Sequence, residues 1–212
     1  MTIQEISGTT DEKLKEWISG KEKLVVGIDG YTGVGKTTIL NELVAINKNV
    51  LAVNQDDFLL SRKTLEDLLA KASDKSKIFE LEDRDNEKIK DLILNFKKGD
   101  ASYETKIFNP ISGDIDIPKT FDLSKKILII EGVFLFHPKL PINNLLDKRI
   151  YLKGDLDRID ARRIKREKER WGKEYFPENH LDSYFRQVII ALRRYIDLYK
   201  PEDLANLVLN ID

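Results

Sequence analysis

The feature that most constrains the fold is a glycine-rich stretch between an apolar run and an amphipathic segment. Residues 30–37 fit the pattern G-x-x-x-x-G-K-[ST] without a mismatch. The apolar run 23–29 before them predicts a buried strand, and residues 36–46 after them predict a helix. In this context, glycines and a helix N-terminus present backbone N–H groups to phosphates. The residues expected to hold a nucleotide are Gly30, Tyr31, Thr32, Gly33, Val34, Gly35, Lys36, Thr37 and Thr38.

Further strands and helices alternate along the rest of the chain. Strands are expected at 50–54, 126–131, 149–152 and 207–211, and helices at 64–72, 86–98, 155–170 and 181–199. The T-x-x-E pattern from Thr9 to Glu12 predicts the start of a first helix that ends near Gly20. This alternation predicts an α/β P-loop NTPase fold, a mostly parallel sheet flanked by helices. One domain over 1–212 is expected, with an arginine-rich helical lid at about 155–175 and a small hairpin or loop excursion at about 99–118.

Composition narrows the class of partner. The chain has 36 basic and 37 acidic residues and no cysteine, so neither nucleic-acid binding nor thiolate chemistry is expected. No apolar run approaches the roughly 20 residues that span a bilayer, and the N-terminus shows no secretory signal. We therefore expect a cytoplasmic protein without a membrane partner. The sequence leaves open whether the protein forms a homo-oligomer.

Two positions at the glycine-rich loop and one strand end predict a site for ATP and Mg²⁺. Lys36 is expected to reach the β- and γ-phosphates, and the Thr37 hydroxyl is expected to ligate the metal. Glu131 ends the apolar strand 126–131, the place where a carboxylate meets Mg²⁺ directly or through water. The alternative for Glu131 is an acid that caps the turn with Gly132.

A carboxylate at the end of a second strand is the candidate general base. Asp56 follows the strand 50–54, and ligands of open α/β sheets bind at the carboxyl ends of strands. A carboxylate there can accept the proton of a hydroxyl acceptor, although strand ends also carry Asp as a turn residue. Asp85 stands at a predicted helix start, where an N-cap is its default interpretation.

The segment 155–170 is dense in arginine. Arg158, Arg162, Arg166 and Arg170 recur every four residues, which places them along one side of a helix. Such a charge run is usually a solvated surface. Next to a phosphate-binding loop, it also predicts a lid whose cations stabilise a transferring phosphoryl group and exclude water.

The order of these motifs resembles the uridine kinase and phosphoribulokinase family of P-loop kinases. The resemblance covers about residues 24 to 212 and includes GIDGYTGVGKTT, NQDDF, IIEGVFLF and RRIKREKER. It implies that Asp56 is the catalytic base and that Glu131 is the strand-end acid. It also implies that Arg163 and Arg166 contact the phosphoryl group, and that the acceptor is held by the set Asp56, Asp85, Tyr103, Arg162 and Arg170.

The sequence departs from the uridine kinases where the acceptor is read. Leu59 and Leu60 replace a Tyr and an Arg, and no His or Arg follows Tyr103 at the positions that help to read the pyrimidine. Without the resemblance, Tyr103 would be interpreted as ordinary packing. The expected function is transfer of the γ-phosphoryl group of ATP to a hydroxyl of a nucleoside or a related small molecule.

Two alternatives remain. One is a kinase for another metabolite, such as pantothenate, a riboside or a sugar, on the same scaffold. The other is a nucleotide-binding regulator that transfers nothing. A GTPase switch would need N-K-x-D, but Asn47-Lys48 is followed by Asn49 and Val50.

Overall fold

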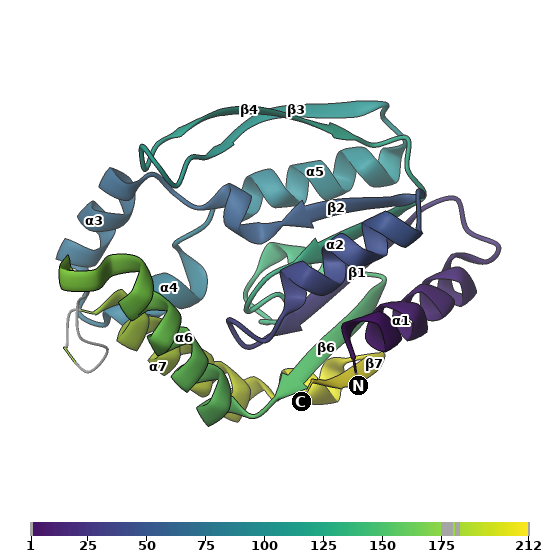
Figure 1. Cartoon of the computed structure of the whole chain (residues 1–212). Helices are drawn as coiled ribbons and strands as arrows, with labels where there is room; N and C mark the ends of the chain where they lie inside the picture. The colour runs from purple at the N-terminus through teal and green to yellow at the C-terminus, as the bar shows by residue number, and fades with distance from the viewer. Residues whose placement is uncertain (1, 175–179, 181–182, 212) are drawn as a thin grey trace.

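The structure is a computed structural model that describes residues 2–174, 180 and 183–211. The order of its elements is easily followed in Figure 1. The helices and strands are α1 (Ile3–Ile18), β1 (Leu24–Gly30), α2 (Lys36–Ile46), β2 (Val50–Asn54), α3 (Arg62–Lys71), α4 (Lys75–Leu81), α5 (Asn86–Lys98), β3 (Ser102–Phe108), β4 (Ile115–Asp122), β5 (Ile127–Glu131), β6 (Lys148–Gly154), α6 (Leu156–Trp171), α7 (Tyr184–Tyr199) and β7 (Leu207–Ile211).

A five-stranded sheet forms the centre of the molecule, with strand order β2-β5-β1-β6-β7 and every pair parallel. All residues of β1 and β5 are buried, as expected for the inner strands of a parallel sheet covered on both faces. From β1 the chain moves outward to β2, and from β5 it crosses β1 to reach β6. The strand order therefore reverses beside β1, and a ligand crevice is expected at the carboxyl ends of β1 and β5.

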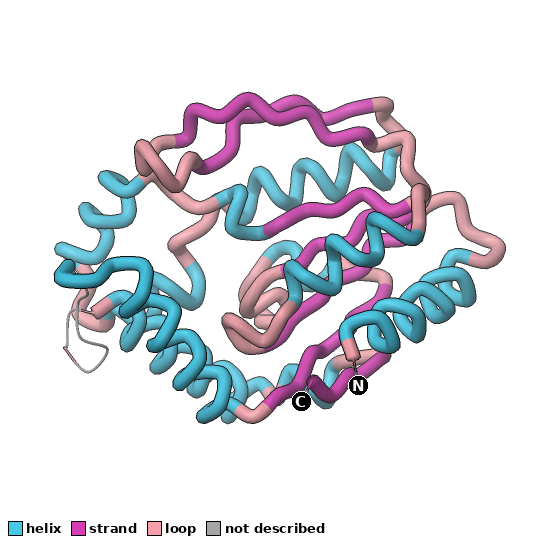
Figure 2. Tube along the Cα trace, in the orientation of Figure 1, coloured by secondary structure: helices cyan, strands magenta, loops and turns pink. Residues whose placement is uncertain are grey.

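Helices surround the sheet, and a hairpin stands apart from it (Figure 2). Helix α1 packs against α2, and α4 packs against α7. Strands β3 and β4 pair in antiparallel register and pack against α5 and the short 3-10 helix Gln55–Phe58 that follows β2. Among the described residues, no helix combines the length and the apolar character that a membrane span requires.

The structure confirms the predicted α/β fold. The expected hairpin begins within its predicted region, at Ser102, but continues past that region to Asp122, because Pro118 sits in an edge strand where its missing N–H breaks no sheet. The first two residues of the predicted helix 181–199, and residue 175 at the end of the predicted lid, lie outside the described residues.

Two local predictions were wrong. The first helix begins at Ile3 rather than near Thr10, because Thr2 and Glu5 form a complete capping box about two turns upstream of the predicted one. Thr10 is instead buried within α1 and donates its hydroxyl proton to the Ile6 carbonyl at 2.7 Å. Helix α4 was not predicted, and its seven residues are too few for a clear helical period.

Candidate active site

The glycine-rich loop joins the end of β1 to the start of α2 at the switch point of the sheet. Gly33 and Gly35 have φ values of +82° and +113°, which residues with a Cβ atom rarely adopt. Gly35 is the N-cap of α2, and no side-chain hydrogen bond caps the helix there. The loop therefore presents backbone N–H groups and the positive end of a helix dipole to the crevice.

Lys36 lies across this loop. Its side chain is buried, and Nζ donates to the carbonyls of Gly30 and Tyr31 at 2.9 and 3.1 Å. Burial lowers the pKa of Lys36, while the negative charges of Glu131, Asp29 and Asp56 oppose that shift. The Lys36 amino group is thus held out of solvent at the loop, where it can meet a polyphosphate.

Thr37 and Glu131 meet at the same edge of the sheet. The Thr37 hydroxyl donates to Glu131 Oε1 at 2.7 Å, although the two residues are 94 positions apart. Burial raises the pKa of Glu131, and the nearby Lys36 cation and the Thr37 hydroxyl lower it. A hydroxyl and a carboxylate oxygen side by side are the donor set that Mg²⁺ prefers, so these two residues fit the expected metal site.

Asp56 lies in the 3-10 helix directly after β2. Its backbone N–H donates to the Asn54 side chain at 2.9 Å, and its own side chain is 64% exposed. Arg84 Nη2 donates to Asp56 Oδ1 at 2.9 Å, a partner that the sequence did not suggest. The carboxylate is therefore exposed at the crevice and held from one side.

The two motifs that flank the crevice interlock through Gln55 and Gly132. Gln55 Oε1 accepts a hydrogen bond from the Val133 N–H at 2.9 Å, and the Gly132 N–H donates to the Ile28 carbonyl at 3.1 Å. A Cβ added at Gly132 would lie 2.7 Å from the Cβ of Gln55. The turn that carries Asp56 therefore fits against the strand end that carries Glu131 only because residue 132 has no side chain.

Replacing Gly132 with alanine is expected to lower the free energy of unfolding by about 1–3 kcal/mol, the usual cost of overpacking a buried contact. The new Cβ must push Gln55 away and break its bond to Val133. The matched control is Gly8→Ala, because nothing lies within 4 Å of a Cβ there. Urea unfolding measures both, and equal stability of G132A and wild type would contradict this packing.

Helix α6 is docked against the glycine-rich loop. Arg162 Nη2 donates to the Gly33 carbonyl at 3.2 Å, and the Tyr31 hydroxyl donates to Asp160 Oδ2 at 2.9 Å. Arg163 is buried, pairs with Asp160 at 3.4 Å and lies over the Phe185 ring at 4.3 Å. Burial lowers the pKa of Arg163, and the Asp160 carboxylate opposes that shift. The expected lid arginines Arg162 and Arg163 thus lie beside the loop.

The remaining predicted site residues lie outside the contact between the glycine-rich loop and α6. Arg166 is largely exposed and pairs with Glu167 at 3.6 Å, and the side chain of Arg170 lies outside the described part of the structure. Asp85 is the N-cap of α5 and accepts a hydrogen bond from the Lys88 N–H at 3.0 Å. This is the capping role expected by default from its position at a helix start. Tyr103 is partly buried in β3, and burial together with the charges of Asp91 and Asp85 raises its pKa.

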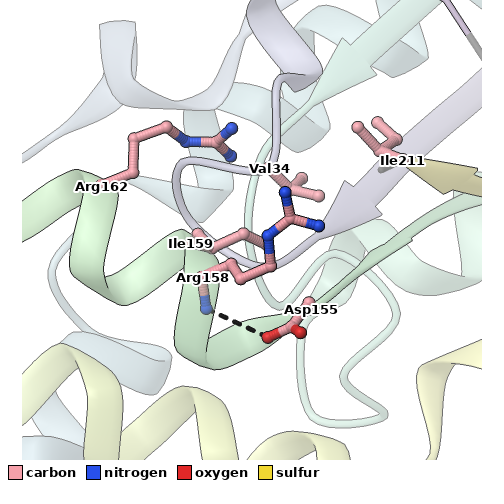
Figure 3. A pocket seen from close by; sticks show the side chains of 6 residues that line it. All are labelled: Val34, Asp155, Arg158, Ile159, Arg162 and Ile211. Carbon is pink, nitrogen blue, oxygen red and sulfur yellow. Dashed lines mark hydrogen bonds between the residues drawn. The ribbon is translucent and has the colours of Figure 1, made fainter.

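A cavity of about 230 Å³ opens beside the loop (Figure 3). Its lining residues come from the loop, from the start of α6 and from the end of β7, and they are Val34, Asp155, Arg158, Ile159, Arg162 and Ile211. The Arg158 side chain extends toward Val34 and Ile211, and its backbone N–H donates to Asp155 at 3.0 Å. The cavity offers apolar walls and two guanidinium groups next to the phosphate-binding loop.

A second hollow of about 450 Å³ lies between the turn before α5 and residues 139–141. Leu60, Arg84 and Asp85 line it, but neither Asp56 nor Tyr103 does. This hollow therefore does not bring Asp56, Asp85 and Tyr103 together.

Sequence patterns missed three partners of the site. Arg84, Asp29 and Tyr195 were not singled out. The Tyr195 hydroxyl donates to Asp29 Oδ2 at 2.7 Å, which ties α7 to the strand that leads into the loop. Burial raises the pKa of Asp29, although three hydrogen bonds and Lys36 stabilise its charge. No periodic pattern in the sequence predicts the contact between Tyr195 and Asp29, because the two residues are 166 positions apart.

Comparison with known proteins assigns the chain to a family. The model of the Phosphoribulokinase / Uridine kinase family matches residues 25–203. The chain therefore belongs to this family, as its motifs predicted. A uridine kinase from Borrelia garinii subsp. bavariensis is 24% identical over 186 residues, which cover 84% of this chain and 86% of that protein. Membership supports a phosphotransferase and implies the use of ATP and Mg²⁺.

Solved structures agree on the fold. The structure of a possible uridine kinase from Bacillus stearothermophilus has a TM-score of 0.72 at 19% identity, covering 99% of this chain and all (100%) of that one. The D-glycerate 3-kinase from Cryptococcus neoformans var. grubii has a TM-score of 0.64 at 14% identity, covering 99% and 95%. At these identities the likeness shows the P-loop kinase fold and leaves the acceptor open.

Proposed function

We propose that the protein is a kinase that transfers the γ-phosphoryl group of ATP, with Mg²⁺, to a hydroxyl group of a small molecule, in the manner of a uridine kinase. The observation that carries the proposal is the meeting of four groups at one edge of the sheet. Lys36 is buried in the loop, Thr37 is bonded to Glu131, and the Asp56 carboxylate stands exposed at the neighbouring strand end.

Each group has a distinct role in this proposal. The loop amides and Lys36 hold the phosphates, and Thr37 with Glu131 holds the metal ion, which supplies charge neutralisation when it is bound. Asp56 accepts the proton of the attacking hydroxyl. Because this carboxylate is exposed while the nearby acids Glu131 and Asp83 are buried, it is the acid available to an incoming acceptor.

The nucleotide is proposed to extend from the loop into the cavity beside Val34. The apolar side chains of Ile159 and Ile211 suit the faces of a base, and Arg158 and Arg162 can stack on it or pair with phosphate. Arg163 and Arg166 are proposed to meet the phosphoryl group. In the structure Arg163 is paired with Asp160, so this role requires α6 to change its contacts.

The acceptor is proposed to be a nucleoside or a related hydroxyl-bearing metabolite that lies near Asp56, with Asp85 and Tyr103 on the hairpin side. Pantothenate, ribosides and sugars remain the alternatives, because the polar residues with which uridine kinases read the pyrimidine are missing after Tyr103.

A panel of acceptors in a coupled assay for ADP release tests the proposal. Uridine, cytidine, other ribosides, pantothenate and simple sugars are each offered with ATP and Mg²⁺. At least one is expected to raise turnover well above hydrolysis in its absence. If none does, while ATP binding is intact, the protein is better described as a nucleotide-binding regulator.

A further inference from the structure

The segment that precedes α5 is attached to the turn that carries Asp56. The Leu60 N–H donates to the Asp83 carbonyl at 3.0 Å, and the Asp85 N–H donates to the Phe58 carbonyl at 2.8 Å. Leu59 and Arg84 face each other in an antiparallel bridge between these bonds. The backbone therefore fixes the origin of the Arg84 side chain relative to Asp56.

The Arg84 guanidinium joins two carboxylates. One of its terminal nitrogens donates to Asp56 Oδ1 at 2.9 Å, and the other donates to Asp83 Oδ1. The Arg84 and Asp83 side chains are 10% and 8% exposed, against 64% for Asp56. Burial raises the pKa of Asp83 to about 6, whereas the two carboxylates raise that of Arg84 and keep it charged. A buried cation is thus fixed by one buried acid and reaches out to one exposed acid.

We propose that Arg84 is a positioning residue for the phosphoryl transfer, which holds one oxygen of Asp56 and leaves the other for the acceptor hydroxyl. This inference rests on the proposed function of Asp56. Asp56 Oδ2 accepts no hydrogen bond from the described residues. An exposed aspartate would otherwise sample several rotamers, and each misplaced rotamer lowers the fraction of productive encounters.

A direct role of Arg84 in binding an anionic group of the acceptor is the competing interpretation. Both terminal nitrogens are already engaged by carboxylates, and the buried Nε makes no hydrogen bond with the described residues. An anion near Arg84 would also face the charges of Asp56 and Asp83. The two interpretations differ in whether the loss of Arg84 changes kcat or the KM of the acceptor.

The test compares Arg84→Gln, Arg84→Lys, Asp56→Asn and the double variant D56N/R84Q with the wild type, using the best acceptor of the panel. R84Q is expected to lower kcat on the order of 10- to 100-fold, the effect of a misplaced catalytic group. The KM of the acceptor and the affinity for a fluorescent ATP analogue are expected to change by no more than about twofold. R84K keeps the positive charge but lacks the two terminal nitrogens of the guanidinium, so its kcat is expected to lie between those of R84Q and the wild type.

The double variant separates positioning from general damage. If Arg84 acts through Asp56, R84Q causes no further fall of kcat in the D56N background. Arg149→Gln is the matched control, a half-buried arginine that donates to the Asn143 carbonyl at 2.7 Å. A raised acceptor KM at unchanged kcat, or an equal loss of kcat in both backgrounds, overturns the inference. Activity of D56N equal to that of the wild type instead overturns the proposed role of Asp56.

Two measurements keep the test decisive if R84Q folds poorly or no acceptor is found. The variant D83N/R84Q removes the buried acid together with its partner, which avoids leaving an uncompensated buried charge. Thermal unfolding of the wild type, D56N, R84Q and D56N/R84Q measures the Arg84–Asp56 coupling without any acceptor. R84Q is expected to destabilise the D56N protein less than the wild type, and strictly additive effects overturn the inference.

Discussion

Replacing Asp56 with asparagine is expected to lower kcat by about 10²–10⁴-fold, the typical contribution of a positioned general base. Asparagine keeps the size and the hydrogen-bond acceptor for Arg84 but cannot take up the proton of the hydroxyl. Because Asp56 is largely exposed, the fold is expected to be retained. The measurement is steady-state ADP release with the best acceptor, together with a titration of a fluorescent ATP analogue, whose affinity should stay near that of the wild type.

The neighbouring acid provides the matched control. The carboxylate of Asp57 accepts a hydrogen bond from Lys119 Nζ of the hairpin at 2.6 Å, whereas the Arg84 guanidinium donates to Asp83 and Asp56. Asp57→Asn makes the same chemical change one residue away, and kcat is expected to stay within about threefold of the wild type, because no transition-state contact is lost. Unchanged transfer by D56N, or equal losses in the two variants, would remove Asp56 from the role of base.

Replacing Lys36 with methionine is expected to lower kcat/KM for ATP by about 10²–10³-fold, the usual effect of removing one electrostatic contact to a developing charge. The methionine fills a similar volume but provides no cation for the phosphates. Lys36 is bonded to two loop carbonyls, and burial lowers its pKa. The charge is thus held there at a cost to folding, so circular dichroism is expected to show an intact fold for K36M.

Lys23 is the matched control for this change. Its Nζ also donates to two backbone carbonyls, those of Leu123 and Lys125 at 2.6 and 2.7 Å, but it lies just before β1, away from the carboxyl ends of the strands. Lys23→Met is expected to lower the melting temperature and leave the affinity for ATP unchanged. If K36M binds and uses ATP as the wild type does, the loop is not the phosphate site.

The regular elements of the sheet were predictable because their signals are local. The apolar runs of β1 and β5 and the glycine that ends α5 each specify their own structure within a few residues. The start of α1 was misplaced because two T-x-x-E patterns compete within that segment, and only the packed helix shows which one is the cap. The short helix α4 has Asp74 as its N-cap but too few turns to show a period.

The candidate site was predictable in its parts rather than in its contacts. Lys36, Thr37, Glu131 and Asp56 are recognisable because each follows a strand or opens a helix in a known motif. That Thr37 bonds Glu131, and that Gln55 fits against Gly132, depends on the register of β1, β2 and β5. The resemblance implied that Arg163 contacts the phosphoryl group, and the structure buries this side chain beside Asp160 and Phe185.

The sequence by itself determined the class of this protein. The glycine loop, the two strand-end acids and the arginine helix are short motifs, and each indicates its chemistry from a few neighbouring residues. Only the tertiary structure decided which side chains act on one another. The Arg84 link between Asp83 and Asp56 forms because the turn after β2 and the segment before α5 meet in an isolated antiparallel bridge between Leu59 and Arg84. No local pattern encodes a contact between residues that are 28 positions apart, as Arg84 and Asp56 are. Side-chain contacts of this kind depend on packing of the whole chain, and they determine how an exposed carboxylate becomes an oriented one.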